Sequence, residues 1–124
     1  MCPQELHLPE PVAAFIDAVN RGDLDALVET FAHRALVNDQ LCEYWDKGAI
    51  AAWAARDVVG QRLGLRVRSA VTNHAQTVVS AEVTGDFDRR GLPDPLMVSF
   101  YFSTHDRRLV QLVILRNEIA TMTL

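Results

Sequence analysis

The sequence predicts an α+β domain in which helices come first and a sheet follows. Apolar residues in the first half recur at i, i+3, i+4 and i+7, the spacing of an amphipathic helix. From Leu65 onward, apolar and polar residues alternate, which is the period of a strand. A group of helices followed by a run of strands is typical of an α+β domain rather than of alternating βαβ units.

Two helices are predicted at the start of the domain. Pro9 and Pro11 stand where proline is tolerated, in the first turn of a helix. Gly22 can end this helix in a left-handed conformation, and Asp23 can cap the next one. The apolar stripes of the two helices are Val12, Phe15, Ile16 and Val19, then Leu24, Leu27, Val28 and Phe31.

The middle of the chain predicts a short strand and a third helix. Residues 35–39 are β-prone at their centre, whereas residues 40–46 show no regular pattern. Asp46 can cap a helix over residues 47–62. The predicted core positions of this helix are Ile50, Trp53, Ala54 and Val58.

Four strands are predicted in the second half, and the last two are apolar on both faces. Their ranges are about 65–72, 77–87, 96–103 and 109–116, with a turn-rich loop over residues 88–95. A sheet with one solvated face would show polar residues on that face, so both faces of these strands need cover. Few helices follow residue 62, and we therefore expect a homodimer formed through the sheet.

Composition excludes several classes of protein. The 124 residues carry a formal net charge of −4, and 49% of them are hydrophobic, enough for one core. The acidic balance disfavours nucleic-acid binding, which needs a basic surface. No apolar run reaches the roughly 20 residues that span a bilayer. We expect neither a nucleic-acid nor a membrane partner.

The two cysteines and the N-terminus predict a cytoplasmic protein. Cys2 and Cys42 could form one bridge, but secreted disulfide scaffolds normally carry more cysteines, so free thiols are favoured. The start MCPQELHLPEP lacks the basic and apolar regions of a signal peptide. No nucleotide, hydrolase or metalloprotease motif is present, and we expect no cofactor and no metal.

Several segments together resemble a known superfamily. They are FIDAVNRGDLDALVETFA (15–32), ALVND (35–39), GAIAAW (48–53) and FYFSTHDRRLVQLVILRNE (100–118). The chain resembles the nuclear transport factor 2-like superfamily, in its SnoaL-like polyketide cyclase and ketosteroid isomerase branch. The resemblance implies a cone-shaped fold with N-terminal helices packed in a strongly curved, mainly antiparallel sheet. Residues 1–8 would form an arm and residues 9–124 a single domain.

The resemblance also implies a mostly apolar pocket that binds a small apolar organic molecule. Trp53 is expected at the entrance or in the core. The other residues implied to line the pocket are Phe15, Asp39, Met97, Ser99, Tyr101, Leu112, Ile114 and Arg116. A lone histidine near a predicted turn, His74, is expected at the surface rather than at the site.

Asp39 is the candidate catalytic residue, with two interpretations of equal weight. It stands where ketosteroid isomerases place their general base, and a carboxylate in an apolar pocket can abstract a proton beside a carbonyl. Alternatively Asp39 and Arg116 pair structurally in a non-catalytic binding or dimerisation module. Phe15 and Ser99 replace the tyrosine and aspartic acid that stabilise the enolate oxygen in the isomerases. Steroid isomerisation is therefore not expected, and an isomerase, cyclase or dehydratase of another substrate is the hypothesis.

Overall fold

The computed structural model describes residues 7–116, in which helical elements precede most of the strands. The helical elements are α1 (Glu10–Arg21), α2 (Leu24–Glu29), α3 (Asp46–Trp53) and the π-helical segment η2 (Ala54–Val59). The strands are β1 (Phe31–Asp39), β2 (Cys42–Trp45), β3 (Gly64–Asn73), β4 (Gln76–Thr84), β5 (Met97–His105) and β6 (Arg108–Arg116). Cys2, most of the predicted arm and residues 117–124 lie outside the described residues. Among the helices of residues 7–116, none is long and apolar enough to cross a bilayer.

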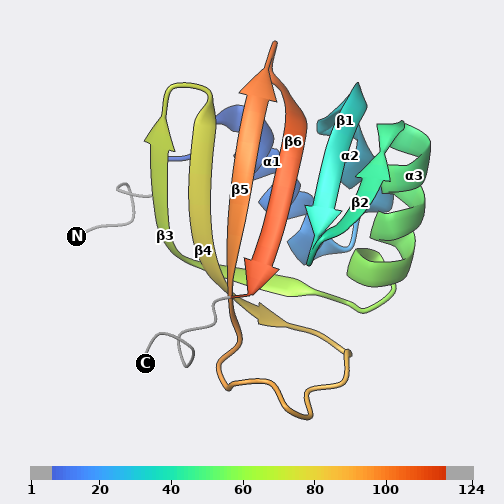
Figure 1. Ribbon diagram of the computed structural model, residues 1–124, viewed down its shortest axis with the longest axis vertical. Coiled ribbons are helices and arrows are strands. Elements are labelled where there is room, and N and C mark those ends of the chain that lie inside the picture. The colour runs from blue at the N-terminus through green and yellow to red at the C-terminus, as the bar shows by residue number, and fades with distance from the viewer. Residues whose placement is uncertain (1–6, 117–124) are drawn as a thin grey trace.

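The strands form one mixed sheet in the order β2-β1-β6-β5-β4-β3. Neighbouring strands are antiparallel except β1 and β6, which are parallel. Helices α1 and α2 lie against one face of this sheet, and α3 lies at its β1–β2 end (Figure 1). Helices packed on a mainly antiparallel sheet confirm the predicted α+β fold class.

The N-terminal helices form as the sequence predicts. Helix α1 ends at Gly22, whose φ of 66° is left-handed, so a residue without a Cβ is favoured there. Asp23 caps α2 by accepting a hydrogen bond from the backbone N–H of Ala26 at 3.1 Å. The predicted stripe of α1 is buried against the sheet, including Phe15, which is 1% exposed.

Two predictions around the first strands are wrong. Phe31, expected on the second helix, begins β1, because β1 pairs with β6 from that residue onward, where it faces Leu109. The supposedly irregular stretch after Asp39 contains β2, which pairs with the end of β1. Gln40 and Leu41 make the tight turn between them with positive φ angles of 53° and 74°. Neither residue type is typical of such a turn, so the sequence carries no hairpin signal.

The third helix is shorter than predicted and continues as a π-helix. Asp46 does not cap it, since Trp45 occupies the cap position and no side-chain cap bond forms. The helix begins at Asp46, which has a φ of 73°, and changes to π-helical geometry at Ala54. All four predicted core positions are nevertheless buried.

The four later strands lie close to their predicted ranges, although β4 ends at Thr84 rather than at residue 87. The buried residues on the inner faces of β4, β5 and β6 are Thr77, Val79, Ala81, Val83, Val98, Phe100, Phe102, Leu109, Leu112 and Ile114. The opposite face of the sheet carries exposed apolar side chains, among them Val78 and Tyr101. The helices therefore cover only one of the two apolar faces.

Replacing Asp23 by alanine tests the contribution of the α2 cap. The backbone N–H of Ala26 and, to a smaller extent, Arg21 hold the pKa of the Asp23 carboxyl below its ordinary value. Such a carboxyl stabilises the fold above its unfolded pKa of about 3.9, and this stabilisation is lost as the pH falls through the lower, folded pKa. Asp23→Ala should therefore lower the thermal unfolding midpoint at neutral pH. The difference between the midpoints of the variant and of wild type should become smaller in acid.

The matched control is Asp25→Ala, which removes an exposed carboxylate from the first turn of the same helix. Asp25→Ala should lower the unfolding midpoint at neutral pH less than Asp23→Ala does. If Asp23→Ala lowers the unfolding midpoint by the same amount from neutral pH to about pH 2, the stabilising role of the ionised cap is contradicted.

Candidate ligand-binding cavity

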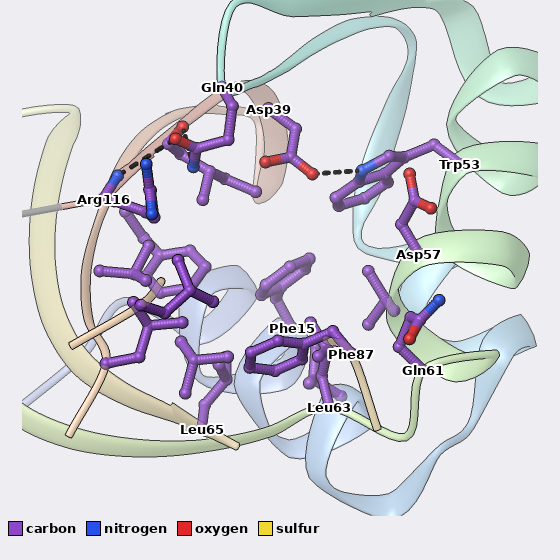
Figure 2. A pocket seen from close by; sticks show the side chains of 18 residues that line it. Phe15, Asp39, Gln40, Trp53, Asp57, Gln61, Leu63, Leu65, Phe87 and Arg116 are labelled. Atoms are coloured by element: carbon purple, nitrogen blue, oxygen red, sulfur yellow. Dashed lines mark hydrogen bonds between the residues drawn. The ribbon is translucent and has the colours of Figure 1, made fainter. Parts of the chain in front are cut away.

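A cavity of about 350 Å³ opens between the inner face of the sheet and the helical layer. This volume is at the lower end of the range for ligand sites, about 300–1,000 Å³. Figure 2 shows the side chains that line it. The apolar lining residues are Phe15, Val19, Trp53, Val58, Leu63, Leu65, Val83, Phe87, Leu92, Leu96, Val98, Phe100 and Ile114. The polar lining residues are Asp39, Gln40, Asp57, Gln61 and Arg116.

The connection between β4 and β5 forms one wall of the cavity. Its start is tied to the segment after η2, because the backbone N–H of Asp86 donates to the carbonyl of Gln61 at 2.7 Å. Its end is tied to β4, where the N–H of Val83 donates to the carbonyl of Leu96 at 2.9 Å. The lining residues of this connection are Phe87, Leu92 and Leu96.

Asp39 is the last residue of β1 and stands half-buried at the cavity. Its Oδ2 accepts a hydrogen bond from the indole Nε1 of Trp53 at 3.0 Å (Figure 2). Within residues 7–116, Oδ1 of the same carboxylate has no hydrogen-bond partner. One oxygen is thus held by the protein, and the other can meet a ligand.

The end of β1 is fixed to β6 by the side chain of the next residue, Gln40. Its Nε2 donates to the carbonyl of Ile114 at 3.0 Å, and its Oε1 accepts from the backbone N–H of Arg116 at 3.3 Å. The backbone N–H of Gln40 also donates to the Ile114 carbonyl at 3.0 Å. The amide thereby continues the parallel strand pairing beyond the point where the backbone turns away.

The indole that holds Asp39 is itself firmly placed. Trp53 is 1% exposed, and the ring of Tyr44 lies 6.2 Å from its ring. The guanidinium of Arg56 stands 5.6 Å above the Tyr44 ring and donates to its hydroxyl at 3.1 Å. Burial and the contact with Tyr44 limit the positions open to the indole, which in turn orients the carboxylate.

The predicted alternative, an ion pair between Asp39 and Arg116, is not formed among the described residues. Both side chains line the cavity, but the carboxylate bonds to Trp53 instead. Arg116 has further contacts of its own and is exposed.

Asp57 and Gln61 line the cavity although the sequence analysis did not select them. Both Asp57 oxygens accept from Arg56, at 3.0 Å and 2.9 Å, and this pairing raises the pKa of the Arg56 guanidinium. The negative charge of Asp57 is therefore paired with the positive charge of Arg56. A signal was available, because Trp53, Asp57 and Gln61 recur every fourth residue and would share one side of the helix predicted over residues 47–62.

The structure brings together Phe15, Asp39, Trp53, Ile114 and Arg116 at the cavity. The prediction for β5 is wrong: Met97, Ser99 and Tyr101 lie on the opposite face of the sheet, and Val98 and Phe100 line the cavity instead. The reason is burial, because the set Val98, Phe100 and Phe102 is the more apolar one and packs inward, whereas Tyr101 is 42% exposed.

Two further residues lie away from the cavity. Leu112 shares the inward face with Ile114 but is fully buried in the core and does not line the cavity. His74 is exposed in the β3–β4 turn, as expected.

No protein-family model matches the chain, and no curated protein matches it. Solved structures do match it over most of its length. SMa1630 of Sinorhizobium meliloti, a proposed polyketide cyclase, is 29% identical, with 86% of this chain and 94% of that chain covered and a TM-score of 0.77.

Two more distant structures share the fold. A proposed SnoaL-like polyketide cyclase from Jannaschia sp. CCS1 is 21% identical over 92% of this chain and 88% of its own, with a TM-score of 0.72. A protein with a ketosteroid isomerase-like fold from Catenulispora acidiphila, solved in complex with trimethylamine, is 18% identical, with a TM-score of 0.73. The match covers 87% of this chain and 85% of that chain. These similarities confirm the predicted resemblance: the chain has the fold of the nuclear transport factor 2-like superfamily and is similar to its SnoaL-like and ketosteroid isomerase-like members.

The fluorescence of Trp53 should report its hydrogen bond to Asp39. The chain has two tryptophans, so Trp45→Phe leaves Trp53 as the only indole. A carboxylate accepts a stronger hydrogen bond from the indole than a neutral amide does. The emission of Trp53 at neutral pH should therefore differ between Trp45→Phe and the same variant with Asp39→Asn added.

Trp45→Phe with Asp25→Asn provides the control, because Asp25 is an exposed aspartate of α2 that does not line the cavity. Its emission should match that of Trp45→Phe. Equal emission in the Asp39→Asn and Asp25→Asn proteins would show that the bond to Asp39 does not affect the indole.

Proposed function

We propose that the chain is an enzyme that binds a small apolar organic molecule and uses Asp39 as a general base. The observation that supports this most is the placement of Asp39, with one oxygen bound to a buried indole and the other available at an apolar cavity. Similarity to SMa1630, a proposed polyketide cyclase, is consistent with chemistry on a carbonyl compound.

The proposed step is proton abstraction from a carbon beside a carbonyl group. Isomerases, cyclases and dehydratases can share this step and differ in what the resulting carbanion does next. The mostly apolar lining keeps water away from the reacting atoms, so a proton passes between the ligand and Asp39 rather than to solvent. A positioned general base typically contributes about 10²–10⁴-fold to the rate.

The cavity limits the size of the ligand. Its volume of about 350 Å³ equals that of roughly a dozen water molecules, so the ligand has on the order of ten to fifteen non-hydrogen atoms inside it. Larger molecules would extend past the rim. The trimethylamine complex of the Catenulispora acidiphila protein shows that a chain of this fold can hold a small organic molecule.

The alternative of a non-catalytic module loses its main support. It required Asp39 and Arg116 to satisfy each other, and within residues 7–116 no such pair forms. A location in the cytoplasm is also part of the proposal, and the exposed free thiol of Cys42 suits a reducing compartment.

Asp39→Asn should abolish the proposed chemistry while keeping the cavity. The measurement is exchange of α-protons for deuterium in a panel of small apolar ketones, followed by proton NMR in D₂O. The variant should exchange at least about 10²-fold more slowly than wild type, because the amide is not a base. Equal exchange by the two proteins would remove Asp39 from the mechanism.

We also propose a homodimer formed through the uncovered face of the sheet. Val71, Val78, Tyr101 and Val113 are register partners on four adjacent strands and form an apolar row across that face. Val71 is 67% exposed and Val78 is 38% exposed, so the row faces solvent in a single chain. A second copy related by a two-fold axis would match the row with itself. The face points toward the viewer in Figure 1.

A charge in this row should break the dimer. Tyr101→Glu should raise the dimer dissociation constant at least tenfold, because burying an unpaired carboxylate is costly. Light scattering coupled to size-exclusion chromatography measures the change. Leu41→Glu, at an exposed apolar residue in the β1–β2 turn, is the control. A wild-type monomer at micromolar concentration would count against the dimer.

A further inference from the structure

We infer that Gln61 is a catalytic residue that donates a hydrogen bond to the carbonyl oxygen of the ligand. This inference rests on the proposed function, because it supplies the second group that a base-catalysed proton transfer needs. Removing a proton from the α-carbon puts negative charge on the carbonyl oxygen, and a positioned donor stabilises that charge. Amide side chains are among the groups that serve this purpose.

The two donors found in ketosteroid isomerases are lost in this chain. Phe15 has no hydrogen-bonding group, and its ring packs edge-on against Phe31 and Phe102 in the core. Ser99 is on the opposite face of the sheet from the cavity and cannot reach it. A base acting here without a donor would form an unstabilised enolate, so another donor must stand in the cavity.

The other polar groups of the cavity are already engaged. The indole N–H of Trp53 is bound to Asp39, and both polar atoms of the Gln40 amide are bound to the backbone of β6. Asp57 has no donor when ionised and is paired with Arg56. Arg116 is exposed at the rim and has other contacts.

Gln61 differs from these residues because its side-chain amide is uncommitted. Within the part of the chain that the structure describes, the side-chain amide makes no hydrogen bond, although Gln61 lines the cavity and is half-buried. Figure 2 shows it on the helical side of the same cavity as Asp39. An amide N–H that has no protein partner can bind a ligand oxygen without first breaking a bond.

The backbone places Gln61 firmly. Its carbonyl accepts from the N–H of Asp86 at 2.7 Å, which ties it to the β4–β5 connection. Before it, the N–H of Gly60 donates to the carbonyl of Ala55 at 2.9 Å. A Cβ at Gly60 would lie 2.6 Å from that carbonyl oxygen, so only glycine allows this tight end of η2. The backbone of Gln61 is therefore fixed, whereas its side-chain amide can change its orientation.

The proposed step balances with these two residues alone. Oδ1 of Asp39 takes the proton from the α-carbon, and the C–H electron pair forms a carbon–carbon double bond. The carbonyl π pair moves to oxygen, which accepts the Nε2–H of Gln61. Return of the proton from Asp39 to carbon regenerates the ketone. In D₂O the protonated carboxyl of Asp39 exchanges its proton with solvent first, so that the atom returned to carbon is deuterium.

The test uses 2-tetralone and tetralin, which share a fused-ring skeleton and differ by the carbonyl oxygen. Wild type is compared with Gln61→Met, a variant of similar length without a donor, and with Gln61→Glu, whose ionised carboxylate repels an enolate. His74→Asn, remote from the cavity and suited to the left-handed backbone of that turn, is the control. Binding of both probes is measured by calorimetry, and deuterium exchange of 2-tetralone is measured by NMR.

We expect Gln61→Met to weaken 2-tetralone binding about tenfold relative to tetralin binding and to slow exchange by at least tenfold, up to about 10³-fold for a well-placed donor. Gln61→Glu should be at least as impaired, and His74→Asn should match wild type. An unchanged ratio of the two affinities in Gln61→Met, or a wild type that binds neither probe, would overturn the inference.

The binding measurements distinguish a failure of this inference from a failure of the proposed function. One outcome is that Asp39→Asn loses exchange while Gln61→Met keeps the wild-type exchange rate and the wild-type ratio of 2-tetralone to tetralin affinity. In that case Asp39 is the base, and the donor is a group other than Gln61. If the affinity ratio depends on Gln61 but wild type exchanges no faster than buffer, Gln61 binds the oxygen and the proton transfer by Asp39 is wrong.

Discussion

The parallel pairing of β1 with β6 is the constraint on which the site depends. It is the one parallel contact in a sheet that is otherwise antiparallel in the described chain. It joins a strand from the start of the fold to one from its end, and it places Asp39 beside Ile114. The Gln40 amide extends the pairing by two further hydrogen bonds, so the carboxylate stands on a strand end that is held from both sides.

A second side-chain amide fixes the opposite wall of the cavity in the same way. Asn20 of α1 donates to the carbonyl of Leu65 at 3.1 Å and accepts from its N–H at 2.7 Å. This bond joins the helical layer to the start of β3, and the Trp53–Asp39 bond joins that layer to the end of β1. The two connections fix the helical layer to the sheet at two strands that border the cavity, because Leu65 and Asp39 both line it.

Periodicity predicted the elements that depend on local patterns. Gly22 and Asp23 mark a helix junction through their own backbone preferences, and the core positions of α3 follow from helical spacing. Elements that depend on distant partners were missed. Phe31 joins a strand because β6 is beside it, and β2 forms because β1 offers an edge. Neither partner is visible from the local sequence.

The site was predicted unevenly for a similar reason. Resemblance to known members of the superfamily predicted Asp39 and Phe15, and helical spacing predicted Trp53. The inward face of β5 was assigned from the same resemblance, but the apolar content of Val98 and Phe100 decides it in this chain. Gln61 could not be selected from its residue type, because a glutamine near a helix end is ordinary. Its significance comes from its position at the cavity and from a side-chain amide that makes no hydrogen bond within the described residues.

Backbone strain is present in the segment that leads from Asp39 into α3. From Gln40 to the first residue of α3, three residues other than glycine have positive φ: Gln40, Leu41 and Asp46. Such conformations cost of order 1 kcal/mol or more each and persist only where surrounding bonds impose them. At Gln40 and Leu41 these bonds are those of the Gln40 amide to β6 and the bond from the Leu41 N–H to the Asn38 side chain at 2.9 Å. The strained segment connects the carboxylate to the helix that carries its indole partner. A turn of different geometry would move Asp39 relative to Trp53, so the hydrogen bond between these two side chains depends on this backbone conformation.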